Sequence, residues 1–285
     1  MGRWRPERGR AGGAAAVVSR RPLTPLLWRF GDAGGPAGVT FVLAPFAGGS
    51  AYSLAELPPR LVRPGDTALV IQYPGRGPRS TEPHATSLSE VAEGAARDIV
   101  RHGTGTLVLA GHSMGGLLCY EIAALLTAMG RPPAGVVVSA APPPDRVRLD
   151  TARVLSMGRG DWLAELAEGA AATGAPVDSD DLADLVIPVL RADYLMLARY
   201  RPEHGPLRVP LLALGGTGDP WVTEDHLEAW RTWTVGGFER RTWPGGHFYY
   251  RERLDDLCTA VRSMPHRATA DEISPPATTG PDPAV

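Results

Sequence analysis

A serine between glycines stands at the centre of the segment Gly111-His112-Ser113-Met114-Gly115. An apolar run rich in β-favouring residues, 106–110, precedes this segment, and an apolar pattern at helical spacing, 116–126, follows it. A serine on a sharp turn from strand to helix projects its hydroxyl above the edge of a sheet, where it can act as a nucleophile. Side chains on the flanking glycines would collide in so tight a turn. Ser113 is therefore the predicted nucleophile, and the alternative is an ordinary strand-to-helix turn.

A nucleophilic serine needs a base and an acidic group that orients the base. In this arrangement the acid and then the histidine follow the serine along the chain. Asp219 lies in a glycine-rich turn directly after the apolar run 209–214, and His247 follows two glycines soon after the run 238–243. Both are therefore predicted to converge on Ser113. The alternative role for the aspartate is an Asx turn, which an aspartate before a proline favours.

The other histidines are weaker candidates for the base. His84 and His102 precede the serine, whereas His204 and His226 lie at the end of an insertion and on a predicted helix surface. His112 neighbours the serine, but we expect its side chain to leave the turn in a different direction.

An oxyanion formed by attack of the serine needs two backbone N–H donors. One predicted donor is Met114, the residue after the nucleophile. The other belongs to the glycine-rich turn 44–50 after the first predicted core strand, where Ala47 is the first choice and Phe46 the second. The alternative is a plain glycine-rich turn without a catalytic role.

The elements that must position these residues alternate between strand and helix patterns. Repeated βα units predict an α/β fold with a largely parallel sheet and helices on both faces. The predicted strands are 39–43, 67–73, 106–110, 135–139, 209–214 and 238–243, and the predicted helices are 53–61, 88–102, 116–126, 224–232 and about 249–264.

Residues 145–207 interrupt this alternation with helical patterns at 154–157, 162–168 and 180–200. A structureless insertion of this length would be uncommon in an α/β domain. Ligands enter such sheets at the carboxyl ends of the strands, and an insertion between two core strands can fold over that edge. We predict a helical lid; the alternative is additional packing on the core.

Composition and charge are those of an ordinary globular protein. The 285 residues are 44% hydrophobic and 21% charged, and the net charge of −2 gives no reason to expect a nucleic-acid partner. All 29 basic residues are arginine, so no lysine can act as a base or form a Schiff base. The two cysteines, Cys119 and Cys258, argue against a disulfide framework and against a cysteine-based metal site.

The two ends of the chain lack the patterns of folded elements. The apolar part of residues 1–21 is too short for a signal sequence, and residues 266–285 show no periodicity. No stretch reaches the roughly 18 apolar residues of a membrane span. We therefore expect disordered ends around a domain over 22–265, a cytoplasmic location and no membrane contact.

Taken together, these motifs resemble those of the type II thioesterases, the stand-alone editing enzymes of polyketide and nonribosomal-peptide assembly lines. The segments that carry the resemblance are Pro45-Phe46-Ala47-Gly48-Gly49-Ser50, Tyr73-Pro74-Gly75-Arg76-Gly77, Gly111–Gly115, Pro188-Val189-Leu190-Arg191-Ala192-Asp193-Tyr194, the turn at Asp219 and the loop at His247. They cover about residues 38–262. Phe46 stands where the family often has histidine, and Ala198 where glutamate is frequent.

The resemblance implies an α/β-hydrolase fold with a lid that shapes an acyl chamber. It implies that Ser113, Asp219 and His247 form a catalytic triad and that Ala47 and Met114 supply the oxyanion hole. The implied substrate is an acyl group on the phosphopantetheine arm of an acyl or peptidyl carrier protein. No metal or cofactor is needed for this reaction.

The resemblance also implies that a carrier protein docks beside the lid. Carrier proteins are generally acidic, so the candidate docking residues are Arg76, Arg79, Arg199 and Arg201. Alternatively, Arg76 pairs internally and the others form a solvated face. We expect a monomer. Two other functions stay open from the sequence: a carboxylesterase of small esters, and a non-catalytic binding partner with a hydrolase fold.

Overall fold

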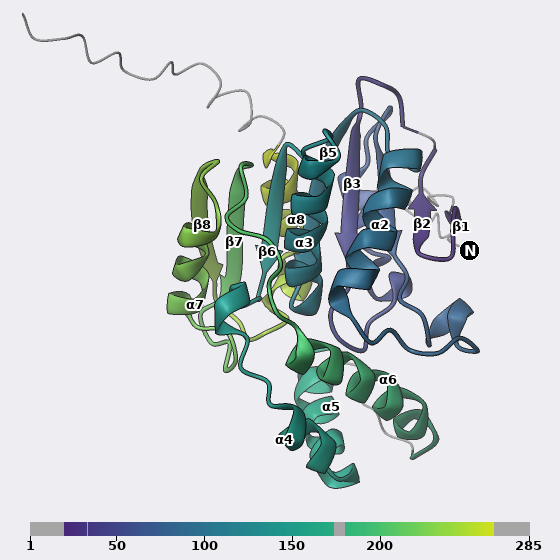
Figure 1. Cartoon of the computed structure of the whole chain (residues 1–285), viewed down its shortest axis with the longest axis vertical. Coiled ribbons are helices and arrows are strands. Elements are labelled where there is room, and N and C mark those ends of the chain that lie inside the picture. The colour runs from purple at the N-terminus through teal and green to yellow at the C-terminus, as the bar shows by residue number, and fades with distance from the viewer. Residues whose placement is uncertain (1–19, 33, 174–179, 265–285) are drawn as a thin grey trace, which may run out of the picture.

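A computed structural model describes residues 20–32, 34–173 and 180–264 (Figure 1). In this part of the chain, eight strands form one sheet in the order β1-β2-β4-β3-β5-β6-β7-β8. Strands β3 to β8 are parallel, and β1 and β2 add antiparallel pairs at one edge. The strands are β1 (Arg20–Pro22), β2 (Leu27–Phe30), β3 (Val39–Ala44), β4 (Thr67–Ile71), β5 (Thr106–His112), β6 (Gly135–Ser139), β7 (Leu211–Gly216) and β8 (Phe238–Trp243).

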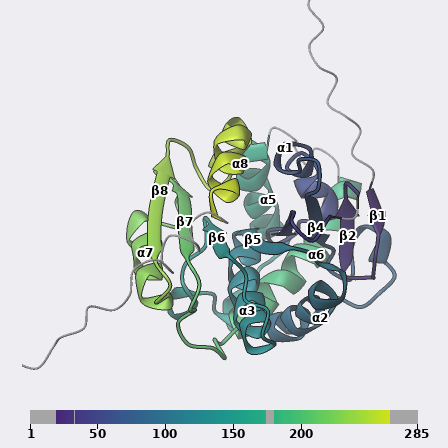
Figure 2. The same ribbon diagram turned by 90° about the horizontal axis from the view of Figure 1, so that it is seen from above.

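Helices cover both faces of the sheet, as Figure 2 shows. The central strands are nearly continuous runs of valine, leucine and alanine because neither face meets water. One face packs against α2 (Leu88–His102), α3 (Met114–Ala128) and α7 (Glu224–Ala229), and the other against α1 (Pro58–Leu61) and α8 (Leu254–Arg262). The side chain of Ser87 accepts a hydrogen bond from the Glu90 N–H and caps the start of α2.

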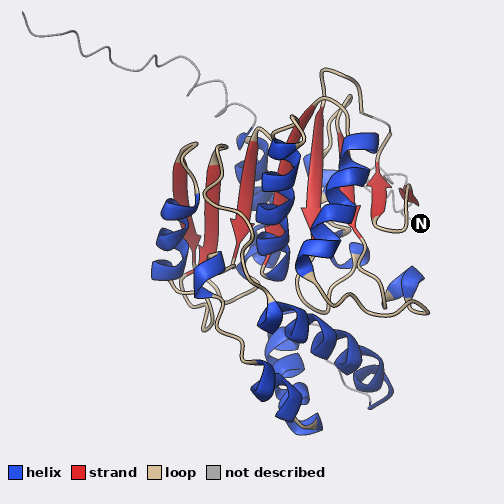
Figure 3. Ribbon diagram, in the orientation of Figure 1, coloured by secondary structure: helices blue, strands red, loops and turns tan. Residues whose placement is uncertain are grey.

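Three further helices, α4 (Thr151–Ser156), α5 (Arg159–Thr173) and α6 (Asp180–Arg199), lie across the carboxyl ends of the parallel strands (Figures 1 and 3). They have a small apolar cluster of their own, in which Trp162 of α5 and Leu190 of α6 are buried, and Ala47 packs against it from the sheet side. The predicted α/β-hydrolase architecture with a helical insertion is therefore confirmed.

The order of the strands places a crevice between β3 and β5. The chain leaves β3 toward β4 on one side, whereas the connection from β5 leads to β6 on the other side. Loops that diverge in this way open a binding site at the carboxyl edge of the sheet. The loop after β3 carries Ala47, and the turn after β5 carries Ser113.

The structure differs from the expectation at several boundaries. The antiparallel pair β1–β2 was not predicted; β1 begins at Arg20, where the described residues begin. The predicted helix 53–61 is instead a short 3-10 turn followed by the four residues of α1, since two prolines, Pro58 and Pro59, interrupt it. Residues 1–19 and 265–285, which include most of the predicted disordered ends, lie outside the described residues.

None of the helices in the described ranges is both long enough and apolar enough to cross a membrane.

Candidate active site

The turn between β5 and α3 holds Ser113 in a conformation that side chains rarely adopt, with φ 54° and ψ −120°. Its N–H donates to the carbonyl of Ser139 on β6 at 2.7 Å. The flanking glycines allow this turn: a Cβ on Gly111 would lie 1.9 Å from the carbonyl oxygen of Gly115, and a Cβ on Gly115 would lie 2.1 Å from the carbonyl oxygen of Ala44. The serine is thus lifted above the sheet edge, as the sequence predicts.

Asp219 and His247 meet at the ends of β7 and β8. The Asp219 carboxylate lies 2.8 Å from Nδ1 of His247, and both side chains are at least nine-tenths buried. The other carboxylate oxygen accepts the N–H groups of Trp221 and Val222 at 2.9 and 3.1 Å. The aspartate therefore makes the Asx turn that was the alternative reading and also contacts the histidine, because each of its two oxygens takes one role.

Backbone contacts hold the aspartate turn against the histidine loop. The N–H of Gly218 donates to the carbonyl of Gly245 at 2.9 Å. A Cβ on Gly216 would lie 2.3 Å from the carbonyl oxygen of Gly246, so only glycine permits this approach. The glycine-rich sequence at both sites thus serves to bring the two loops together.

Ser113 and His247 line one cavity of about 580 Å³ beneath the lid helices. Among the described residues, no hydrogen bond joins the serine hydroxyl to the histidine; such bonds are often long in unliganded sites. The imidazole packs edge-on against Trp221, with ring centroids 4.8 Å apart. Trp221 also lines the cavity, although no sequence motif identified it. Its place two residues after the predicted acid was the only signal.

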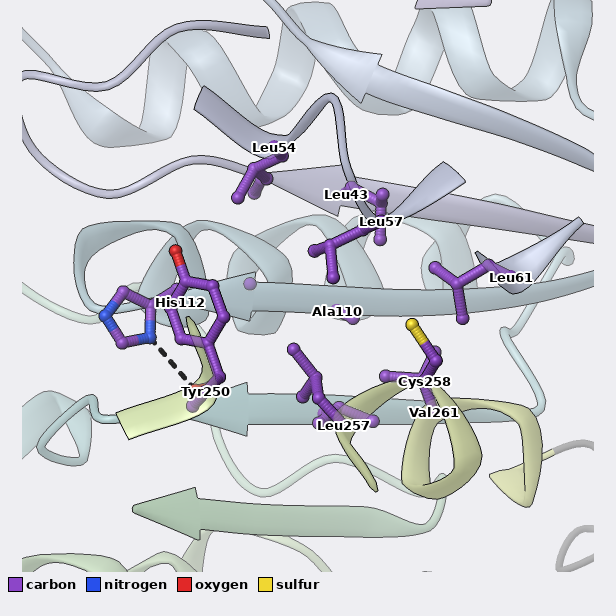
Figure 4. Close-up of a pocket in the computed structure, with 14 residues that line it drawn as sticks. Leu43, Leu54, Leu57, Leu61, Ala110, His112, Tyr250, Leu257, Cys258 and Val261 are labelled. Carbon is purple, nitrogen blue, oxygen red and sulfur yellow. Dashed lines mark hydrogen bonds between the residues drawn. The ribbon is translucent and has the colours of Figure 1, made fainter. Parts of the chain in front are cut away.

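The side chain of His112 does not line this cavity, although its ring centroid lies 5.0 Å from that of His247. Its Nδ1 lies 3.0 Å from the hydroxyl of Ser139, which in turn contacts the hydroxyl of Tyr249 at 2.8 Å. Figure 4 shows its ring beside Tyr250, at the end of a small apolar pocket of about 30 Å³. Burial lowers the pKa of His112 well below its usual value, and the nearby charges of His247 and Arg251 lower it further. His112 is therefore neutral in the folded chain, and its hydrogen-bond partner is Ser139 rather than Ser113.

The predicted oxyanion donors, Ala47 and Met114, both line the cavity with Ser113. Within the described part of the chain, neither N–H donates to a protein acceptor. Met114 is the first residue of α3, where backbone N–H groups lack partners in the helix. Phe46, the second choice, packs against Phe248 with ring centroids 4.9 Å apart and forms part of the cavity wall.

Most of the cavity wall is apolar, and the lid supplies much of it. The inserted segment contributes five apolar side chains to the cavity wall: Leu149, Val154, Leu166, Leu190 and Leu197. Polar side chains also contribute: Arg146, Arg148, Arg153, Glu165, Tyr194 and His226. No group of three or more His, Cys, Asp or Glu side chains in the described ranges is arranged to hold a metal ion.

The structure corrects the prediction that Arg76 is a docking residue. Its side chain is 5% exposed and forms a bidentate ion pair with Asp193 of α6, which is the internal pairing named as the alternative. Arg79 is partly buried and pairs with Glu82. Arg199 and Arg201 are exposed at the end of the lid, but neither lines the cavity.

The ion pair also excludes Asp193 as a substitute for Asp219, since both of its carboxylate oxygens contact Arg76 rather than a histidine. His204 does not contact Asp219 either. Its Nδ1 lies 2.6 Å from the buried carboxylate of Glu121 in α3, behind the serine turn.

Comparison with known proteins places these features in one family. Residues 40–264 match the family model described as "Thioesterase domain". The thioesterase PikA5 of Streptomyces venezuelae is 35% identical over 231 residues, which are 78% of this chain and 79% of that protein. A probable cadicidin biosynthesis thioesterase of Streptomyces griseus is 31% identical over 229 residues, 80% of this chain. The chain spans only 63% of that relative's length.

A solved structure has the same fold. The type II thioesterase BorB from the borrelidin biosynthetic cluster superimposes with a TM-score of 0.75 at 30% identity, over 82% of this chain and 95% of that one.

Proposed function

The chain belongs to the thioesterase family, and we propose that it hydrolyses acyl thioesters with Ser113 as nucleophile, His247 as base and Asp219 as the group that orients the base. One observation carries this proposal. The His247–Asp219 contact of 2.8 Å and the strained serine turn face a single cavity, in which an acyl group can reach the serine.

The reaction begins when His247 takes the proton of Ser113 as the serine oxygen attacks the thioester carbonyl. Asp219 keeps a proton on Nδ1 of the histidine, so that Nε2 is the basic nitrogen, and it stabilises the imidazolium that forms. The N–H groups of Ala47 and Met114 donate to the oxyanion. The carbon–sulfur bond then breaks, and His247 returns the proton to the departing thiolate.

The second half of the reaction repeats these roles with water. His247 removes a proton from a water molecule that attacks the acyl-serine ester. Collapse of the second oxyanion releases the carboxylic acid, and the proton on His247 returns to the serine oxygen. A thiolate is a good leaving group, so acylation needs no distortion of the substrate.

The substrate class follows from the cavity and from the relatives. Two relatives are named for the biosynthesis of cadicidin and of borrelidin, and the apolar wall of the cavity suits an acyl chain. We therefore assign as substrate an acyl group carried on the phosphopantetheine arm of an acyl or peptidyl carrier protein. Removal of such groups would serve editing or product release in polyketide or nonribosomal-peptide synthesis.

The proposed docking surface for the carrier lies at the cavity rather than at the four arginines predicted from the sequence. Arg148 and Arg153 both line the cavity and are exposed, and in the described ranges neither pairs with a carboxylate. Guanidinium groups without an acidic partner attract an acidic protein and steer its approach. Arg199 and Arg201 lie farther along the lid and remain candidates for a wider contact.

A panel of acyl-carrier thioesters tests this function directly. Release of free carrier thiol is measured for the full chain, with Ser113→Ala as the matched control. Loss of about 10⁴-fold or more in kcat is expected from removal of a triad nucleophile. Near-wild-type hydrolysis by Ser113→Ala would refute the assignment.

The two alternative functions predict different results in the same experiments. A small ester turned over faster than every carrier thioester would favour the carboxylesterase. Failure of a fluorophosphonate to label Ser113 would favour a non-catalytic binding partner.

A further inference from the structure

Arg76 and Asp193 contact each other in the structure, and neither has a role in the proposed reaction. Arg76 follows β4, and Asp193 lies in the lid helix α6, 117 residues farther along the chain. The guanidinium contacts both carboxylate oxygens, at 2.5 and 2.6 Å, and the two side chains are 5% and 1% exposed. A buried ion pair does not by itself explain the stability of a fold, because replacing both partners with apolar side chains often leaves the protein equally stable. The contacts around the pair indicate another role.

The ion pair also holds the backbone of the loop that carries Ala47. The carboxylate of Asp193 accepts the N–H of Gly48 at 2.7 Å, and the guanidinium of Arg76 donates to the carbonyl of Gly49 at 3.2 Å. Gly48 has φ +80°, a conformation that other residues rarely adopt and that the loop must maintain. The two residues after Ala47 are thus fixed by the side chains of the pair.

The other end of the same loop is held by Tyr73, two residues after the end of β4. The hydroxyl of Tyr73 donates to the carbonyl of Pro45 at 2.8 Å, and the Arg76 guanidinium lies 5.0 Å from the Tyr73 ring centroid. Burial raises the pKa of Tyr73, and the charge of Asp193 raises it further, so the hydroxyl stays a donor. Ala47 therefore sits between two anchored stretches of backbone, and only the anchor at Gly48 depends on the lid.

We propose that Arg76 and Asp193 are positioning residues that hold the Ala47 N–H in place for the oxyanion, and that they do so only while α6 is seated. This inference rests on the proposed function, in which Ala47 is an oxyanion donor. Because Asp193 belongs to α6, a lid that moves away withdraws the carboxylate from Gly48. The pair thereby couples assembly of the oxyanion hole to closure over the acyl chain.

The charge of each partner makes the pairing necessary. Asp193 alone would place an unpaired buried carboxylate beside the loop that must accommodate a developing negative charge. Arg76 neutralises that carboxylate while it leaves the Gly48 contact intact. The N–H that binds the oxyanion is thus fixed without a net charge that opposes it.

A double variant separates positioning from stability. Replacement of both partners, Arg76→Met with Asp193→Leu, leaves no unpaired buried charge, and such exchanges are often neutral for folding. Steady-state hydrolysis of an acyl-pantetheine thioester is measured beside the free energy of unfolding, with Arg79→Met as the matched control. We expect kcat of the double variant to fall about 10- to 100-fold with KM within about twofold, since an oxyanion contact forms only in the transition state.

The outcomes separate the inference from the proposed function. Wild-type kcat in a folded double variant would overturn the inference while thioester hydrolysis stands. If the wild-type chain itself releases no thiol, the proposed function fails instead. Should the double variant not fold, Arg76→Gln with Asp193→Leu also removes the acceptor of the Gly48 N–H without leaving a buried charge. The same loss in kcat at constant KM is expected of it, and wild-type kcat would overturn the inference.

Hydrogen exchange tests the link to the lid. In the wild-type chain, peptides that cover Gly48 and α6 should lose protection together as urea is added below the unfolding transition. In the double variant the two peptides should exchange independently. Independent exchange already in the wild-type chain would overturn the coupling to the lid.

Discussion

Replacement of Ser113 by glycine tests the strain in the nucleophile turn. Its φ of 54° with ψ −120° costs a residue that has a Cβ about 1–3 kcal/mol, whereas glycine adopts this conformation freely. Among the described residues the serine hydroxyl has no hydrogen-bond partner, so its removal breaks no hydrogen bond. Glycine makes the unfolded chain more flexible, which offsets about 0.4–1 kcal/mol of the gain.

The difference in the free energy of unfolding between two variants that lack the serine hydroxyl measures this strain. Ser113→Ala keeps the Cβ and lacks only the hydroxyl, so it is the matched control. We expect Ser113→Gly to be more stable than Ser113→Ala by about 1 kcal/mol, which corresponds to roughly 2–4 °C in Tm for a domain of this size. Urea unfolding and calorimetry measure the two quantities.

A substitution at an unstrained position calibrates the comparison. Ala164 is exposed in the interior of α5, and Ala164→Gly should destabilise the chain by about 1 kcal/mol. If Ser113→Gly is less stable than Ser113→Ala by a similar amount, the turn stores no strain and the reasoning is refuted.

Three further changes have distinct expected results. Asp219→Asn should lower kcat about 10⁴-fold with little change in KM, because the amide no longer favours the tautomer that has its proton on Nδ1; full activity would place the orienting acid elsewhere. His112→Asn should remove part of the acid sensitivity of folding. Burial lowers the pKa of His112 in the folded chain. Below about pH 6.5 the imidazole is therefore protonated in the unfolded chain but not in the folded one, and the free energy of unfolding falls by up to about 1.4 kcal/mol per pH unit. Unfolding free energies at pH 7.5 and 5.5 measure this slope, and an unchanged slope in the variant contradicts the assignment. Arg148→Glu and Arg153→Glu should lower kcat/KM for an acyl-carrier protein, with a shallower salt dependence, and leave acyl-pantetheine unaffected. Arg101→Glu, in the last turn of α2, is the control. Equal losses of kcat/KM on both substrates would mean that Arg148 and Arg153 act on the site itself.

The triad candidates could be predicted from the sequence because each depends on a short stretch of chain. Ser113 is identified by the strand before it, the helix after it and the glycines beside it. Asp219 and His247 each follow a strand in a glycine-rich loop, and parallel strands bring their carboxyl ends to one edge. The order of the sheet was not needed for this inference.

The role of Arg76 could not be predicted in the same way. An arginine in a loop after a strand is usually exposed, and a docking role is a reasonable expectation for it. It is buried because α6 crosses the loop and supplies Asp193, a contact between residues 117 positions apart. The pattern of one segment carries no information on which residue of a distant helix will cover it.

The two parts of the site are held by different kinds of contact. The serine turn and the histidine loop depend on backbone atoms packed where no side chain fits, as at Gly115 and Gly216. Close packing of this kind does not open in small steps. The three proposed catalytic residues are therefore expected to keep their arrangement whether or not a substrate is bound.

The lid, in contrast, is attached through side chains: Met196 and Leu197 of α6 pack into the main core, and polar side chains near its end and at its middle add further contacts. Tyr200, directly after α6, donates to the carboxylate of Glu121 in α3 at 2.5 Å, and His204 contacts the other oxygen at 2.6 Å. Burial and the charge of Glu121 raise the pKa of Tyr200, so this hydroxyl remains a donor. Both contacts anchor the exit of the lid to the helix behind the nucleophile. Because that end is held, we expect α6 to move mainly in the part that includes Asp193. Such movement would break the contact between Asp193 and the Gly48 N–H and so disturb the loop that carries the proposed oxyanion donor.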